Sequence, residues 1–153
     1  MNKRLAEFVA TTGGLGYLPL APGTWAAALS AIIWCALCLT KSNPFVWQLI
    51  LMPLLVFAGV YCTDKILKEE EKDPSYIVID EFAGLWFSLL FIQPSYKNAI
   101  AGFILFRIFD IAKPWGIKKM ENFKKGWGIM LDDLLAGLYS NLILQSLVLF
   151  KLW

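Results

Sequence analysis

Near the start of its last apolar stretch the sequence reads Ile129-Met130-Leu131-Asp132-Asp133-Leu134-Leu135-Ala136-Gly137, and mostly apolar residues continue to the final residue, 153. A run of this length predicts a membrane helix, because about 20 helical residues span about 30 Å of hydrocarbon. Two carboxylates inside it are unexpected, since a charge near hydrocarbon is costly unless it is paired or bound to a metal. The stretch therefore predicts a membrane helix with a functional acidic pair near one end.

Three further apolar stretches lie upstream, at residues 25–39, 45–62 and 82–112. The third is interrupted at residues 93–98, which predicts a turn between two short helices and leaves open whether residues 82–92 span the membrane or re-enter. The first ten residues predict an amphipathic helix at the membrane surface. We therefore expect an all-α integral membrane bundle of about four to five membrane helices with an N-terminal interfacial helix, forming one domain over residues 1–153.

The composition supports a membrane protein and excludes several chemistries. The chain is 58% hydrophobic and 17% charged, against about 45–50% and about 25% in soluble domains. It contains no histidine, which excludes Ser-His-Asp hydrolysis and histidine-bound zinc. A net charge of +2 is too small and too dispersed to predict a nucleic-acid partner.

The charges predict an orientation. If the N-terminus is cytoplasmic, eleven of the 14 Lys and Arg residues fall on the cytoplasmic side, and the other three are Lys41, Lys97 and Lys151. Cytoplasmic loops of membrane proteins carry such an excess of Lys and Arg. All twelve carboxylates fall on the same cytoplasmic side, so any acidic site is expected there.

Charged side chains interrupt apolar sequence at two more places. Asp80-Glu81 joins two apolar runs, and Arg107 and Asp110 share one helix face, with Lys113 just beyond. Carboxylates without His or Cys form a hard oxygen site that suits Mg²⁺. The predicted metal ligands are Asp80, Glu81, Asp110, Asp132 and Asp133, and the predicted catalytic residues are these five with Arg107 and Lys113. The alternative is an ion-pair network that serves packing alone, with Asp110 on Arg107 and Asp133 on Lys113.

A glycine-rich segment, residues 13–24, precedes the first apolar stretch. We predict that Thr24 caps a helix starting near Trp25 and that backbone N–H groups there face an anion. The predicted phosphate-binding residues are Gly23, Thr24, Arg107 and Lys113. A flexible connecting loop is the alternative, since no nucleotide P-loop pattern is present.

Four blocks, in this order, resemble the phosphatidylglycerophosphatase A family. They are Gly14-Leu15-Gly16 through Ala21-Pro22-Gly23-Thr24, Asp80-Glu81-Phe82 with Gly84, Phe106-Arg107-Ile108-Phe109-Asp110 with Lys113-Pro114-Trp115, and residues 126–137. The chain departs from the family pattern at Ala26-Ala27, Gly116 and Lys125, and each of these departures leaves the charged motif residues in place.

The resemblance implies a Mg²⁺-dependent integral membrane phosphatase that converts phosphatidylglycerophosphate to phosphatidylglycerol in the bacterial inner membrane. Attack by a metal-activated water and formation of an aspartyl-phosphate both remain open. It also remains open whether the substrate is another lipid phosphate. A cation transporter is the rival from a different class, although transport sites normally lie near the middle of the bilayer. The sequence leaves the oligomeric state open.

Overall fold

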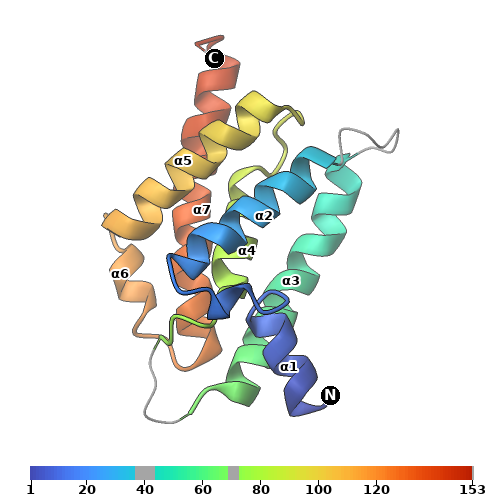
Figure 1. The fold of residues 1–153 in the computed structure, drawn as a ribbon. Helices are drawn as coiled ribbons and strands as arrows, with labels where there is room; N and C mark the ends of the chain where they lie inside the picture. Colours follow the sequence, from blue (N-terminus) through green and yellow to red (C-terminus); the bar gives the residue numbers. More distant parts are fainter. Residues whose placement is uncertain (37–43, 69–72, 153) are drawn as a thin grey trace.

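The computed structural model describes residues 1–36, 44–68 and 73–152, and within them the chain forms helices and no strands (Figure 1). This confirms the all-α prediction. The helices are α1 (Lys3–Ala10), the 3₁₀-helix η1 (Leu15–Tyr17), α2 (Pro22–Ala36), α3 (Pro44–Ile66), α4 (Ile79–Ser88), α5 (Tyr96–Ala112), α6 (Ile117–Met120) and α7 (Gly126–Leu149).

Most helices fall on predicted stretches, with differences at their ends. Helix α6 was not predicted; its four residues are too few to show a hydrophobic period. The last three residues of the first predicted stretch, 37–39, lie outside the described residues, as do Lys41, Lys72 and residue 153.

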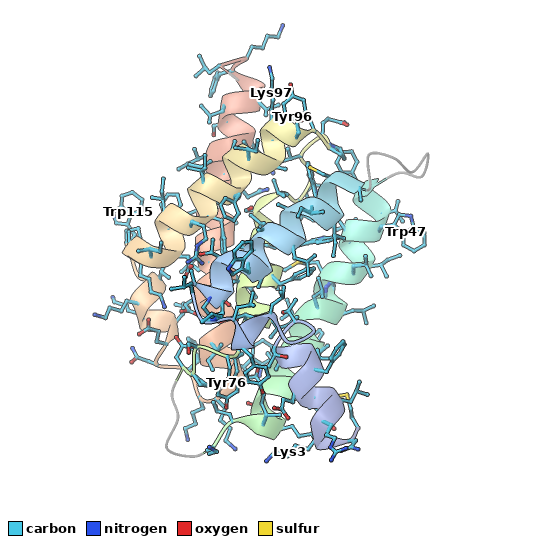
Figure 2. All side chains as sticks on the ribbon, in the orientation of Figure 1. Lys3, Trp47, Tyr76, Tyr96, Lys97 and Trp115 are labelled. Carbon is cyan, nitrogen blue, oxygen red and sulfur yellow. The ribbon has the colours of Figure 1, made fainter. Side chains whose placement is uncertain are left out.

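The two ends of the bundle differ in charge. Lys3 lies at one end with α1 and the N-terminal turns of α7, while Lys97 lies at the other with the start of α5 and the C-terminus (Figures 1 and 2). Helix α6, which carries Lys118 and Lys119, lies toward the same end as α1. The predicted separation of basic residues is therefore present in the fold wherever the chain is described.

The outer surface of the bundle is apolar. Helix α3 is the one helix, in the part of the chain that is described, that is long and apolar enough over Phe45–Ile66 to cross a membrane. Other helices also expose large apolar side chains, and soluble monomers rarely expose such residues in contiguous patches. Examples on α2, α5 and α7 are Ile32, Ile104, Ile111 and Leu142. The number of membrane helices stays a prediction.

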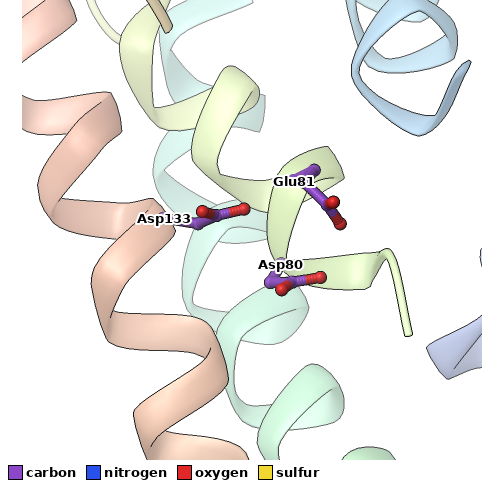
Figure 3. Close-up of side chains that lie close together, drawn as sticks. All are labelled: Asp80, Glu81 and Asp133. Carbon is purple, nitrogen blue, oxygen red and sulfur yellow. The ribbon is translucent and has the colours of Figure 1, made fainter. Parts of the chain in front are cut away.

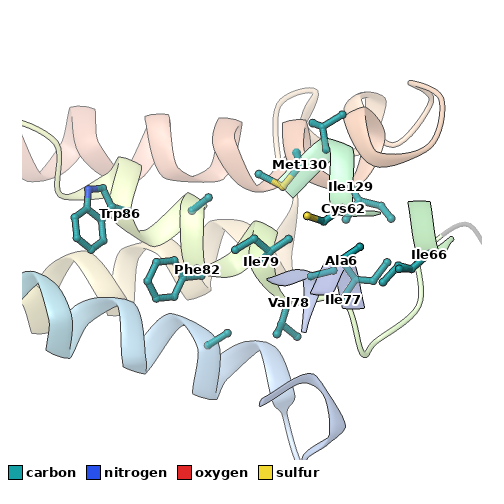
Figure 4. Close-up of a cluster of buried hydrophobic side chains, with 14 of the residues drawn as sticks. Ala6, Cys62, Ile66, Ile77, Val78, Ile79, Phe82, Trp86, Ile129 and Met130 are labelled. Atoms are coloured by element: carbon teal, nitrogen blue, oxygen red, sulfur yellow. The ribbon is translucent and has the colours of Figure 1, made fainter. Parts of the chain in front are cut away.

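Helix α4 lies in the middle of the bundle. Its Ile79, Phe82 and Trp86 join side chains of α1, α3 and α7 in one buried cluster (Figure 4). Its closest approach is to α7, where a Cβ atom on Gly137 would lie 2.4 Å from the carbonyl oxygen of Gly84. The two glycines thus allow close helix contact behind the carboxylates.

Helix α4 ends earlier than predicted. At this end, side-chain amides take the place of backbone N–H groups as donors to the carbonyl oxygens. The Asn141 amide donates to the carbonyl oxygens of Ser88 and Leu90 at 2.9 and 2.8 Å. The Gln48 amide donates to that of Leu89 at 3.3 Å. Carbonyl groups at a helix end must find partners when no water is near. Ten residues rise only about 15 Å, so α4 alone is too short to span a bilayer.

Candidate active site

Three carboxylates meet where the first turn of α4 faces α7. One carboxylate oxygen from each of Asp80, Glu81 and Asp133 lies within 4.8 Å of the others, and Figure 3 shows the Asp133 side chain reaching toward α4. Asp80 and Asp133 are buried, 7% and 3% exposed. The N-terminal end of α4 is the favourable end of the helix dipole for acidic side chains. These three residues form the carboxylate triad.

Each triad member holds a buried oxygen atom that lacks a hydrogen-bond partner among the described residues, namely Asp80 Oδ1, Glu81 Oε2 and Asp133 Oδ2. Buried polar atoms are nearly always satisfied, and like charges at this separation repel. A cation placed among the three would satisfy the free oxygens and balance the charge. The donor set is all oxygen, so the residues fit Mg²⁺.

The glycine-rich segment reaches the triad through Gly23. A Cβ atom on Gly23 would lie 1.8 Å from Glu81 Oε1, so only glycine lets the carboxylate rest against the start of α2. That helix begins at Pro22 rather than near Trp25, because proline suits the first helical position. Thr24 therefore lies in the first turn, where its N–H donates to the carbonyl of Ala21 at 3.0 Å, and the prediction that Thr24 caps the helix is wrong.

Lys113 pairs with Asp132, which precedes Asp133 in the sequence. Its Nζ lies 2.6 Å from Asp132 Oδ2 and 2.8 Å from Glu121 Oε1, so the ion pair predicted for Asp133 forms instead with Asp132. Burial acts to lower the pKa of Lys113, but the two hydrogen bonds outweigh it and hold the pKa above its ordinary value. The ammonium group therefore stays charged at the edge of the site.

Arg107 and Asp110 form the ion pair expected for residues three positions apart on α5. The Asp110 charge acts on both Glu81 and Asp133, which places Asp110 beside the triad. Among the predicted site residues, Asp80, Glu81 and Asp133 thus form the centre. Asp110, Asp132 and the two cations surround it, and Gly23 touches Glu81.

The structure adds three acidic residues that the pattern of the sequence did not single out. Glu121 shares Lys113 with Asp132, and Asp64 accepts the Gly126 N–H at 2.7 Å where α7 begins. Asp73 interacts electrostatically with Lys113 and Glu121. All three lie in or beside polar connecting segments, where a solvated carboxylate is the ordinary expectation, so no sequence signal marked them.

Known proteins resemble this chain over most of its length. The profile of the family described as phosphatidylglycerophosphatase A matches residues 8–148. A phosphatidylglycerophosphatase A from Escherichia coli is 35% identical, over 86% of this chain and 76% of its own length, and one from Haemophilus influenzae is 34% identical, over 88% and 83%. A Bacteroides thetaiotaomicron protein with the provisional name phosphatidylinositol-3-phosphatase is 44% identical, over 92% and 91%. No solved structure matched the chain.

Proposed function

Because this chain belongs to the phosphatidylglycerophosphatase A family, we propose that it hydrolyses the terminal phosphomonoester of phosphatidylglycerophosphate to give phosphatidylglycerol and phosphate. The observation that carries the proposal is the carboxylate triad, whose three buried oxygens lack partners among the residues that the structure describes, with two cationic side chains close by. This arrangement of charges suits a metal-dependent reaction on a phosphate group.

Asp80, Glu81 and Asp133 would hold Mg²⁺, with Asp110 and Asp132 next to them. Mg²⁺ held there would supply positive charge toward a phosphate group and would lower the pKa of a water molecule. Arg107 and Lys113 hold equatorial phosphate oxygens, where negative charge is spread in the transition state. The backbone N–H group of Gly23 approaches the same phosphate from the start of α2, whereas that of Thr24 already donates to the Ala21 carbonyl. An Asp nucleophile remains the alternative to water.

We propose further that the protein crosses the bacterial inner membrane several times and that the site faces the cytoplasm. The exposed apolar faces of α2, α3, α5 and α7 support this, and so does the concentration of Lys and Arg at the end of the bundle near α1. Cytoplasmic ends of membrane helices carry such an excess of basic residues.

A second candidate substrate is phosphatidylinositol 3-phosphate. It is favoured by the 44% identity to the Bacteroides protein whose name carries that activity. Both lipids present a phosphomonoester on a polyol head group, so the same triad serves either reaction.

The test is phosphate release by the protein purified in detergent. The substrates are phosphatidylglycerophosphate, phosphatidylinositol 3-phosphate, phosphatidate and a soluble phosphomonoester, each with Mg²⁺ and with EDTA. We expect Mg²⁺-dependent release with phosphatidylglycerophosphate preferred. Preference for another lipid would keep the site and change the substrate. Folded protein that binds Mg²⁺ but releases no phosphate would overturn the phosphatase and favour a transporter.

A further inference from the structure

Three aromatic side chains pack together where the end of α5 and the turn after it meet α7. The ring centroids of Phe109, Trp115 and Tyr139 lie between 5.8 and 6.3 Å from one another. Phe109 is buried, whereas Trp115 is 78% exposed and projects from the side of the bundle (Figure 2). This aromatic cluster has no role in the proposed chemistry, although Trp115 follows Lys113 by only two positions.

The backbone holds Trp115 in its exposed position. The φ of Trp115 is 45° and that of Lys113 is 42°, a region that bulky side chains rarely adopt. Such a conformation persists when the surroundings fix it, and here the Tyr139 hydroxyl donates to the Trp115 carbonyl oxygen at 2.9 Å. Lys113 therefore reaches Asp132 on α7 while Trp115 points outward from the same short turn.

The turn runs along one face of α7. Asp132 and Tyr139 share that face, because seven positions correspond to nearly two full turns. Lys113 contacts Asp132 and Trp115 contacts Tyr139, so the two contacts are about 10 Å apart along the axis of α7. The aromatic contact is the one farther from the α1 end (Figure 1). With the α1 end in the cytoplasm, as proposed, the aromatic cluster lies deeper in the membrane than the phosphate-binding lysine.

Exposed aliphatic side chains continue from the aromatic cluster along the outer flank. Ile111 on α5 is 73% exposed, and Leu142, three positions beyond Tyr139 on α7, is 55% exposed. Lys113 keeps 23% of its side chain exposed, so a molecule lying along this flank would meet a cation, then an aromatic ring and then aliphatic groups. A phospholipid that ends in a phosphomonoester presents its phosphate, its ester-linked glycerol and its acyl chains in the same order. An indole ring suits the middle position, because it joins an apolar body to an N–H donor.

We propose that Trp115, positioned by Tyr139, binds the ester region and the first acyl carbons of the lipid substrate while the phosphomonoester lies at Lys113 and the carboxylate triad. The inference rests on the proposed function and adds to it the residues that distinguish a membrane lipid from a soluble phosphomonoester. The acyl chains then lie farther from the cytoplasm than the phosphomonoester, as in a bilayer. Trp115 takes no part in bond cleavage.

The experiment compares Trp115→Ala and Trp115→Phe with the wild type in mixed micelles of detergent and lipid. KM, kcat and the Mg²⁺ concentration for half-maximal activation are measured with whichever of phosphatidylglycerophosphate and phosphatidylinositol 3-phosphate the wild type hydrolyses. For Trp115→Ala we expect KM to rise about tenfold, the scale of a lost aromatic contact. The other two quantities should stay within about twofold, since only substrate binding is weakened. Trp115→Phe should recover most of the affinity, because it keeps an apolar ring.

Tyr139→Phe tests the positioning of Trp115. It removes the hydrogen bond to the Trp115 carbonyl and keeps the ring, so KM should rise about threefold, as for one neutral hydrogen bond. In a Trp115→Ala background the same change should leave KM unaltered, because the two residues act through one contact. An equal effect in both backgrounds would overturn the positioning role of Tyr139.

The matched control is Trp47→Ala. Trp47 on α3 is 48% exposed and lies on the opposite flank of the bundle from Trp115 (Figure 2). Its loss should leave KM within about twofold, as for a surface substitution away from a site.

Four outcomes would overturn the inference. An unchanged KM for Trp115→Ala would remove the ring from substrate binding, and an equal rise for Trp47→Ala would assign it to general membrane anchoring. A smaller oligomer of Trp115→Ala in size-exclusion chromatography would assign the ring to a contact between copies of the chain. Loss of kcat with a shifted Mg²⁺ dependence would make Trp115 a support of the metal site. Failure of the proposed function is seen separately, as absence of lipid phosphate hydrolysis by the wild type.

Discussion

At the scale of single residues, the site is defined by atoms that lack partners. Where α4 meets α7, three carboxylates each bury an oxygen atom that has no partner in the described part of the chain. Holding like charges together costs free energy in the absence of a cation. The triad brings three carboxylate oxygen atoms within 4.8 Å of one another, which is the arrangement that a cation would satisfy.

Replacing Asp133 with Asn should abolish activity while leaving the fold intact. We expect kcat/KM to fall at least about 100-fold, the scale for losing a group that stabilises transition-state charge. In EDTA the unfolding temperature should equal or exceed that of the wild type, because one repulsive charge is gone. Both are measured on detergent-purified protein, with Glu7→Gln on α1 as the control that keeps activity. A marked loss of stability in EDTA would indicate that Asp133 serves packing.

Gly23 offers a second test at this scale. Replacing it with Ala puts a methyl group 1.8 Å from the present position of Glu81 Oε1. Because that atom is the end of a flexible side chain, Glu81 should rotate away and the fold should survive. The expected result is at least about tenfold weaker Mg²⁺ activation, since loss of even an outer partner of a metal costs about that much, read from activity against Mg²⁺ concentration. An unchanged Mg²⁺ dependence would remove Glu81 from the metal site.

At the scale of elements, the short helix α4 determines where the carboxylates lie. It begins beneath α2, where Ser30 Oγ donates to the Phe82 carbonyl at 2.8 Å, and it ends inside the bundle under Asn141 and Gln48. A helix that stops in an apolar environment needs such caps. Amide side chains on two long helices therefore fix the length and the position of the element that carries Asp80 and Glu81.

Replacing Asn141 with Leu should destabilise the protein without touching the triad. The Ser88 carbonyl would lose its donor in a buried setting, which costs about 1–3 kcal/mol. The measurement is the unfolding temperature in detergent, with Ser146→Ala as the control. Ser146 is exposed on the same helix, and its hydroxyl donates only to the carbonyl four residues earlier. Equal unfolding temperatures for the two variants would contradict the capping role.

At the scale of the whole molecule, basic side chains and exposed apolar side chains occupy different parts of the bundle. Basic side chains gather at the end that carries α1, exposed apolar side chains cover the flanks, and Lys97 lies at the opposite end (Figure 2). This distribution is the one expected if, as proposed, the helices cross a bilayer with the α1 end in the cytoplasm.

Single cysteines at positions 3 and 97 test this orientation. In a background with Cys35, Cys38 and Cys62 replaced by Ala, a membrane-impermeant thiol reagent added to intact spheroplasts should label Lys97→Cys. Lys3→Cys should react only after the membrane is opened. The reverse pattern would invert the topology, and labelling of both positions in sealed spheroplasts would contradict a spanning bundle.

The sequence by itself determined the helical class, the acidic motifs and the family, because these follow from local patterns. Apolar runs predict α2, α3, α5 and α7. The carboxylates that lie in or next to apolar sequence are costly to bury without a partner, and they are Asp80-Glu81, Asp110 and Asp132-Asp133. The start of α2 at Pro22 was missed because Thr24 is also a common capping residue.

Only the tertiary structure decided which of these acidic residues form the triad and which one pairs with Lys113. It assigned Asp133 to the triad and Asp132 to Lys113, because adjacent residues on a helix point about 100° apart and only the packing of α7 against α4 and α5 selects which one faces each neighbour. It also ended α4 at Ser88 and brought Gly23 against Glu81. Each of these depends on contacts between segments far apart in the chain, which local sequence patterns do not encode.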